Sequence, residues 1–294
     1  MESEMQRKAF RAKMVDKMLG IGPIFTVSRD GGGDFLNTSI KRRLVTRMHR
    51  THERRRASVF IGPPGIGKTT AAAAFMQANP NNVAYYKVAK TGMTGPQALQ
   101  QLLLALRKLS GKQTKYVTNA TLEVQRYIDL EIESLGGGLL RSDAPDRFPH
   151  LTVIFDEAQR LTHGAIDALR DYNEPHYFCS GAFPIGLIFI GNEHTPLEVR
   201  NDGKTIFDEG MTDRLLYRER LTYDDLERSD VELFVRSLGV DDNEAVNAVV
   251  TLFSTTSDDQ RSLRRVSDFT DLLHDEAMGE PITAATVRAV LGVD

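Results

Sequence analysis

Residues 62–69 read Gly-Pro-Pro-Gly-Ile-Gly-Lys-Thr, a complete G-x-x-x-x-G-K-[ST] phosphate loop. In such a loop the backbone N–H groups cradle phosphates, the lysine reaches the β and γ oxygens, and the hydroxyl binds Mg²⁺. The flanking sequence fits this motif. The apolar run at Ala57–Ile61 predicts a buried strand, and the Ala-rich run at Thr69–Gln77 predicts a helix whose N-terminus faces the anion. The segment therefore predicts a nucleotide-phosphate site.

Composition indicates a globular protein that works in a reducing compartment. The chain has 294 residues, 41% of them hydrophobic and 26% charged. A single cysteine, Cys179, excludes an internal disulfide framework. No apolar run approaches the ~20 residues of a membrane span, and the first 20 residues lack the apolar core of a signal peptide. We expect a cytoplasmic protein with no membrane partner.

Charge is distributed very unevenly along the chain. Residues 1–60 hold 14 Lys/Arg and six Asp/Glu, and residues 61–122 hold seven Lys/Arg and no acid. Residues 222–294 hold six basic and 16 acidic residues. The basic half favours a polyanionic partner, although opposite halves could also neutralise each other within the chain or between subunits.

Strand and helix patterns alternate through the first two thirds of the chain. Besides Ala57–Ile61, short apolar runs predict strands at Val83–Val88, Leu151–Phe155 and Gly186–Ile190. Helical patterns lie between them, and only helical patterns follow Leu221. The predicted fold class is α/β: a parallel sheet flanked by helices, then a small all-α domain. We expect an N-terminal helical segment at 1–34, a core at 35–221 and a helical domain at 222–294.

Polar residues follow two of the predicted strands. Asp156 and Glu157 come directly after Leu151–Phe155, where an Asp can orient Mg²⁺ and its waters and a Glu can polarise an attacking water. Asn192 follows Gly186–Ile190, where its amide could hold that water or serve as a turn residue. These residues predict hydrolysis of the γ-phosphate at this edge of the sheet.

Two arginine pairs lie farther along the chain. Arg214, expected on a short helix, could reach a neighbouring subunit's nucleotide as an arginine finger, or form a surface ion pair with Asp213 or Glu219. Arg218 is a rival for the finger role. On the C-terminal helices, Arg264 could contact phosphates, and only one of Arg264 and Arg265 should point inward.

The order GPPGIGKT, IFDEA, FIGN, TDRLL and SLRRV resembles the AAA+ ATPases from about Ala57 to Leu291. The resemblance implies an Mg²⁺-dependent ATPase with a P-loop core and a helical lid, assembled as a ring or helical filament. It implies nucleotide binding by the loop, an Mg²⁺ site at Thr69 and Asp156, and catalytic roles for five residues. The implied nucleotide-binding residues are Gly62, Pro63, Pro64, Gly65, Ile66, Gly67, Lys68, Thr69, Thr70 and Asp156; the implied catalytic residues are Lys68, Glu157 (the second Walker B acid), Asn192 (sensor 1), Arg214 (finger) and Arg264 (sensor 2).

Within AAA+, the DEAQRL and IGNE stretches and the basic helix before the loop look like the transposition ATPases MuB, TniB and TnsC. That resemblance implies a protein that polymerises on double-stranded DNA with ATP and delivers target DNA to a transposase, with a target-selection protein as a further partner. It places DNA contacts at Lys90, Thr91, Lys112, Thr114 and Lys115, within the acid-free stretch. No separate helix-turn-helix domain is evident in the first ~30 residues, which favours the shorter TniB/TnsC type.

Two other classes of function stay open at this point. A clamp- or helicase-loader-like ATPase would act mainly on a protein partner docked by the basic helix. A nucleotide-dependent signalling or scaffolding switch would self-associate without nucleic acid.

Overall fold

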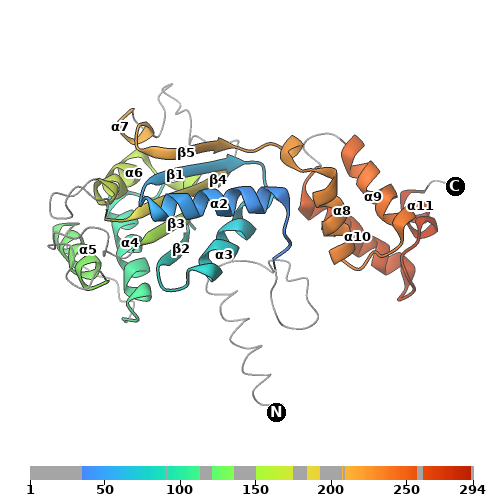
Figure 1. Ribbon diagram of the computed structural model, residues 1–294, viewed down its shortest axis with the longest axis horizontal. Coiled ribbons are helices and arrows are strands. Elements are labelled where there is room, and N and C mark those ends of the chain that lie inside the picture. The colour runs from blue at the N-terminus through green and yellow to red at the C-terminus, as the bar shows by residue number, and fades with distance from the viewer. Residues whose placement is uncertain are drawn as a thin grey trace, which may run out of the picture. The chain divides into compact units, whose positions relative to one another are not determined.

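The computed structural model describes residues 35–89, 92–112, 121–135, 150–174, 184–192, 207, 209–256 and 261–292 (Figure 1). These residues divide into two compact units. The first contains residues 45–61 and the described part of 72–220, and the second contains residues 35–44, 62–71 and the described part of 221–292. Within the described ranges, every helix falls short of the length and apolar character needed to cross a bilayer.

A five-stranded sheet with the order β2-β3-β4-β1-β5 forms the centre of the first unit. The β2–β3, β3–β4 and β1–β5 pairs are parallel. The Leu187 N–H donates to the Arg56 carbonyl at 3.1 Å, so β4 and β1 also begin side by side. The strands are β1 (Ala57–Gly62), β2 (Val83–Lys87), β3 (Thr152–Asp156), β4 (Gly186–Asn192) and β5 (Leu215–Arg220). This confirms the predicted parallel α/β sheet.

One face of the sheet is covered by three helices. Alternate strand residues such as Val153, Phe155 and Leu187 join buried side chains of these helices in one apolar cluster. Removing such side chains from water supplies most of the stabilisation of a domain of this kind. The helices are α4 (Gly95–Leu109), α5 (Thr121–Leu135) and α6 (His163–Arg170), with the short turns η3 (Ala158–Arg160) and η4 (Asp171–Asn173) beside α6.

The opposite face meets the helices on either side of the phosphate loop. These are α2 (Ser39–Glu53) and α3 (Lys68–Ala78). Thr51 of α2 shares a 2.7 Å hydrogen bond with Ser58 of β1, and the His52 and Phe75 rings meet edge to face at 5.8 Å. The predicted helix before the loop is therefore present and packs on the sheet.

The strand β5 was not expected from the sequence. Its first three residues are partly buried, Arg218 and Arg220 are exposed, and within the strand only Glu219 is buried, because β5 lies at the edge of the sheet. Glu219 forms an ion pair with Arg47 of α2, and the Arg47 guanidinium lies 5.4 Å from the centre of the Tyr217 ring. Charged residues are common on edge strands, and they hide the apolar pattern by which buried strands are recognised.

The C-terminal helices of the second unit lie together (Figure 1). Their side chains enclose an apolar core of their own. Val235, Val249, Val266 and Leu273 are among its buried members. The elements are η6 (Tyr223–Asp225), α8 (Arg228–Ser237), α9 (Asn243–Thr255), α10 (Leu263–Ala277) and α11 (Ala284–Leu291); the short α7 (Glu209–Thr212) belongs to the first unit. The helical region predicted after Leu221 is therefore confirmed.

A buried carboxylate joins the start of α2 to α8 within the second unit. Asp230 is only 4% exposed and accepts hydrogen bonds from the Ser39 backbone N–H (2.7 Å) and the Ser39 hydroxyl (2.5 Å). One turn later, Arg43 forms a 2.8 Å ion pair with Asp225. A carboxylate at a helix N-terminus satisfies free amide groups and complements the helix dipole, so these contacts fix where α2 begins.

A buried histidine at the amino edge of the sheet, His52, predicts acid sensitivity. His52 Nδ1 shares a 2.8 Å hydrogen bond with the Thr152 hydroxyl, and burial lowers the His52 pKa to about 4. Between pH 6.5 and 4 the unfolded chain binds a proton that the folded chain does not, so stability falls as the pH falls. We expect the free energy of unfolding to fall by about 1–2 kcal/mol over this pH range. This is less than the full pKa shift would give, because nearby solvent screens the charge. Urea unfolding at pH 7.5, 6, 5 and 4.5 measures it.

The control is a matched pair of substitutions. His52→Gln should flatten the dependence between pH 6.5 and 4.5, while His274→Gln, at an exposed histidine of α10, should leave it in place. Equal slopes in the wild type and in His52→Gln would contradict the assignment.

Candidate nucleotide site

The phosphate loop leaves β1 at Gly62 and closes onto the start of α3. Gly65 (φ +75°) and Gly67 (φ +98°) both have left-handed backbone conformations, which glycine adopts without steric cost. The Ala71 N–H donates to the Gly67 carbonyl at 2.9 Å, so the first turn of α3 begins inside the loop. The amide groups of that turn suit a phosphate, since a helix N-terminus favours negative charge.

Lys68 lies inside the curve of this loop. Its side chain is 7% exposed, and Nζ donates 2.7 Å hydrogen bonds to the carbonyls of Gly62 and Pro63. A buried ammonium held by neutral carbonyls is well placed to act as a counter-charge for phosphate. The residues present therefore fit a nucleotide phosphate, in agreement with the sequence motif.

Residues of the C-terminal helices hold the same loop within the second unit. The Leu263 N–H donates to the Gly65 carbonyl at 3.1 Å, and the Tyr223 hydroxyl donates to the Pro64 carbonyl at 2.9 Å. A β-carbon at Gly65 would lie 2.8 Å from that of Ser262 and 3.4 Å from that of Arg264. The β-carbon of Arg264 thus lies beside the loop, and Arg264 and Arg265 are both exposed. The phosphate contact of Arg264 stays a prediction.

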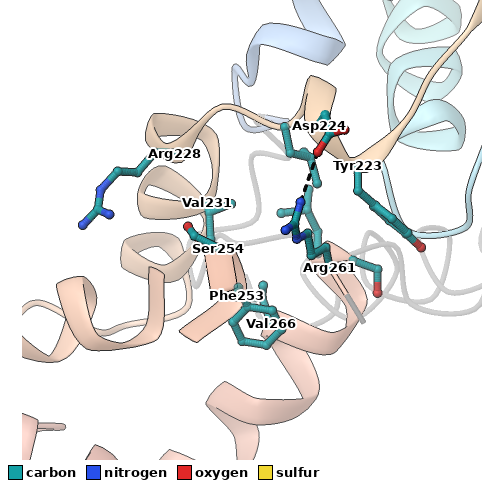
Figure 2. A pocket seen from close by; sticks show the side chains of 11 residues that line it. Tyr223, Asp224, Arg228, Val231, Phe253, Ser254, Arg261 and Val266 are labelled. Atoms are coloured by element: carbon teal, nitrogen blue, oxygen red, sulfur yellow. Dashed lines mark hydrogen bonds and ion pairs between the residues drawn. The ribbon is translucent and has the colours of Figure 1, made fainter. Parts of the chain in front are cut away.

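A pocket of about 170 Å³ adjoins these contacts (Figure 2). Tyr223, Ser262 and Leu263 line it and also contact the loop, while Phe253 and Val266 give it apolar walls. The ion pair between Asp224 and Arg261, 3.0 Å long, closes one side (Figure 2). Sequence reasoning did not find this pocket because its walls come from η6, α8, α9 and α10 together.

The two carboxylates predicted for hydrolysis end β3 in the first unit. Asp156 is 4% exposed; its Oδ1 accepts the Glu157 backbone N–H at 2.8 Å, and its Oδ2 accepts the Tyr85 hydroxyl at 2.7 Å. Burial, and then the negative charge of Asp156, raise the pKa of Tyr85, so this hydroxyl remains a donor. A carboxylate at a strand end suits the hard cation Mg²⁺.

Glu157 is oriented by its own chain and by two neighbours. Its backbone is left-handed (φ +59°), a conformation that costs a non-glycine residue about 1 kcal/mol. The Gln159 amide donates to Glu157 Oε2 at 2.7 Å, and Gln159 Oε1 accepts the Asn192 N–H at 3.3 Å. Arg160 lies 3.8 Å from the same Oε2. The structure therefore links Glu157 to Asn192 through Gln159, a residue that the sequence analysis passed over.

Arg160 also ties this site to the end of β2. Its guanidinium donates to the carbonyls of Val88 (3.0 Å) and Ala89 (3.1 Å), while its own carbonyl accepts the N–H groups of Gly92 and Met93. The motif alone could not show this, because the contacts join segments about 70 residues apart.

The remaining candidate arginines and lysines have defined places. Arg214 follows α7 in a turn rather than lying on the expected short helix. It pairs with Glu174 at 3.0 Å, whereas the alternative to the finger role had named Asp213 or Glu219 as its partner. Arg218 is exposed on β5. Lys112 Nζ pairs with the buried Glu131 at 2.8 Å. Lys90, Thr91, Thr114 and Lys115 lie outside the described residues, as does the N-terminal segment at 1–34.

Comparisons with known proteins agree with this geometry. The family model described as "AAA domain" matches residues 50–196, half of the chain. No curated protein sequence matches the chain. The CDC6P structure from Pyrobaculum aerophilum is similar with a TM-score of 0.60 and 13% identity over 93% of this chain and 69% of that one. The structure of the Aeropyrum pernix ORC2 protein in its ADP form is similar with a TM-score of 0.56 and 16% identity. That match covers 91% of this chain and 71% of the ORC2 chain. At these identities the two structures support the fold alone.

The loop contacts predict a specific steric coupling. Gly65→Ala adds a β-carbon 2.8 Å from that of Ser262 at a left-handed position, so we expect a loss of about 2–3 kcal/mol in stability. Gly67→Ala meets no atom within 4 Å and should cost only about 1 kcal/mol of strain. Urea unfolding of each variant measures the difference.

A double mutant tests the mechanism. Ser262→Gly alone destabilises the protein because it removes the N-cap of α10. In the double mutant with Gly65→Ala it also removes the clash, so the double mutant should be about 1 kcal/mol more stable than the sum of the two single effects predicts. Strict additivity would show that the clash does not exist.

Proposed function

The chain belongs to the AAA domain family, and we propose that it is a Mg²⁺-dependent ATPase that binds double-stranded DNA without sequence preference, oligomerises on it and directs a transposase to target DNA. We retain the division at about Thr222 into an AAA+ core and a helical lid, meaning residues 222–294, as part of this proposal. The observation that carries the ATPase part is the phosphate loop with Lys68 enclosed in it.

In this proposal the loop amides and Lys68 bind the β- and γ-phosphates of ATP. Thr69, Thr70 and Asp156 complete the nucleotide and magnesium sites, and bound Mg²⁺ would neutralise charge on the phosphates. Glu157 polarises the attacking water, and Asn192 orients it. The carboxyl ends of β3 and β4 lie at one edge of the sheet, which supports the shared role of these side chains.

Hydrolysis would be completed by a neighbouring subunit. Arg214 would reach the neighbour's γ-phosphate, and Arg264 would contact phosphate from the lid of its own subunit. The pair between Arg214 and Glu174 leaves both side chains 30–41% exposed, and exposed ion pairs of this kind contribute little stability. The pair can therefore be exchanged for a phosphate at low cost.

The DNA part rests on charge and on the residues that flank Lys90 and Thr91. Residues 61–122 contain no acid, and Lys90, Thr91, Lys112, Thr114 and Lys115 are the proposed phosphate contacts. Arg160 contacts residues on both sides of Lys90 and Thr91 and also pairs with Glu157, so a phosphate bound there could alter the catalytic carboxylate through one side chain. This arrangement supports DNA-dependent hydrolysis.

One observation favours a second candidate, a loader-like ATPase that acts mainly on a protein partner. Lys112 already pairs with the buried Glu131, which also accepts a 3.1 Å hydrogen bond from the Ser110 hydroxyl. A lysine committed to a buried carboxylate offers less charge to DNA.

Negative-stain microscopy with duplex DNA separates the two candidates. With ATP and Mg²⁺ we expect filaments or stacked rings on the DNA, and none without nucleotide. Lys68→Ala should abolish assembly because the phosphate counter-charge is lost. Glu157→Gln should preserve assembly while slowing hydrolysis at least ~100-fold, since a general base contributes about 10²–10⁴.

Closed rings that ignore DNA, or monomers under all conditions, would reject the transposition-regulator proposal. DNA binding that appears only with an added protein partner would support the loader-like candidate instead.

Lys112 predicts a measurable salt dependence. If it neutralises one DNA phosphate, Lys112→Gln should weaken binding for all duplex sequences and reduce the slope of log K against log salt by about 1. Glu131→Gln should strengthen binding, because it removes the partner that now holds the ammonium. Fluorescence anisotropy between 50 and about 200 mM salt measures both effects.

Lys108→Gln is the matched control, since it removes the same charge from an exposed position on α4. Equal slopes for Lys112→Gln and Lys108→Gln would show that Lys112 contributes only to overall charge.

A further inference from the structure

A tyrosine on β2 contacts the carboxylate that ends β3. The Tyr85 hydroxyl donates to Asp156 Oδ2 at 2.7 Å, and Tyr85 and Asp156 are 9% and 4% exposed. In the register of the two strands Tyr85 lies opposite Ile154, and Asp156 lies opposite Lys87. Tyr85 and Asp156 therefore occupy the same face as diagonal neighbours, close enough for a long side chain to bridge.

The hydroxyl completes a two-point hold on Asp156. Its Oδ1 accepts the Glu157 N–H at 2.8 Å, while its Oδ2 accepts the tyrosine hydroxyl, so the plane of the carboxylate is fixed from both sides. The Tyr85 hydroxyl therefore restricts rotation of the carboxylate about its terminal torsion, which is broad for Asp. Fixing a metal-binding carboxylate by an outer hydrogen bond is a common way to raise metal affinity.

We propose that Tyr85 is a positioning residue for magnesium, acting through Asp156. Its hydroxyl holds the carboxylate in one orientation, ready to meet Mg²⁺ or its water ligands when the nucleotide is bound. This inference rests on the proposed ATPase function. In a purely structural role the ring would fill space and the hydroxyl would only satisfy its hydrogen bond. Loss of the hydroxyl would then lower stability, and any change in nucleotide affinity would be the same with and without Mg²⁺.

The test uses Tyr85→Phe in the full chain, with Tyr86→Phe as the matched control. Tyr86 is the next residue on β2 and lies on the other face, where its ring meets Phe155 edge to face at 6.1 Å. Binding of a fluorescent, non-hydrolysable ATP analogue is titrated with Mg²⁺ and repeated in EDTA. For Tyr85→Phe we expect the Mg²⁺ midpoint to rise about 3–10-fold while affinity in EDTA stays within about twofold, and Tyr86→Phe should match the wild type.

A double mutant shows whether the effect passes through Asp156. Adding Tyr85→Phe to Asp156→Asn should shift the midpoint no further than Asp156→Asn alone, because the carboxylate to be positioned is gone. A shift of equal size in both backgrounds would overturn the inference.

Two other outcomes overturn it and separate it from the proposed function. The positioning role is rejected if Tyr85→Phe has the wild-type Mg²⁺ midpoint, or if it loses nucleotide affinity equally with and without Mg²⁺. In both cases the ATPase proposal stands, because the wild type still binds the nucleotide in a Mg²⁺-dependent way. Absence of Mg²⁺-dependent binding in the wild type rejects both.

Discussion

The position of β1 within the sheet is the constraint on which the site depends. All six of its residues are buried, and it lies between β4 and β5. A strand held on both edges cannot slip by one residue without turning its apolar side chains to the wrong face. The residue at which β1 ends is therefore fixed, and Gly62, where the phosphate loop begins, is fixed with it. A β-carbon on Gly62 would come within 2.7 Å of that of Leu221, which explains why a glycine is required there.

The two edges of the sheet have different chemistry. At the amino edge, polar groups close on one another: Asn173 donates to the carbonyls of Arg55 and Ile185, and the His52 ring meets Thr152. Such pairing offsets part of the cost of burying polar groups and helps to fix the sheet, while Asn173 Oδ1 is buried without a hydrogen-bond partner among the described residues. At the carboxyl edge, the Asp156 carboxylate accepts the Glu157 N–H and the Tyr85 hydroxyl, and Glu157 Oε2 accepts the Gln159 amide. These hydrogen bonds orient two acidic side chains at the edge to which the proposed function assigns Mg²⁺ and the attacking water.

Much of this arrangement could be predicted from the sequence, because buried strands and glycine-rich loops have strong local patterns. The four apolar strands, the loop and the helices after Leu221 all follow from periodicity and turn residues. The strand β5 could not be predicted, since Arg218 and Arg220 interrupt its apolar residues at an exposed edge. The contacts of Tyr85, Arg160 and Arg214 were also beyond reach. They depend on strand register or on side chains brought together from distant segments, and neither is encoded within a short window.

The strained backbone at Glu157 separates the two acidic residues at the end of β3. A left-handed conformation at a non-glycine residue persists only where surrounding contacts enforce it. Here the Asp156 carboxylate accepts the Glu157 N–H, and Gln159 and Arg160 hold its side chain. The turn at Glu157 directs the chain away from the end of β3. Glu157 therefore does not continue the alternation of an extended strand, and its surroundings differ from those of Asp156. Asp156 stays on the buried face beside Tyr85, whereas Glu157 faces Gln159 and Arg160. The two adjacent carboxylates thereby have separate partners: Asp156 is held by Tyr85, and Glu157 by Gln159 and by Arg160, which also contacts the end of β2. In the proposed function this separation lets one carboxylate meet the cation while the other orients the attacking water.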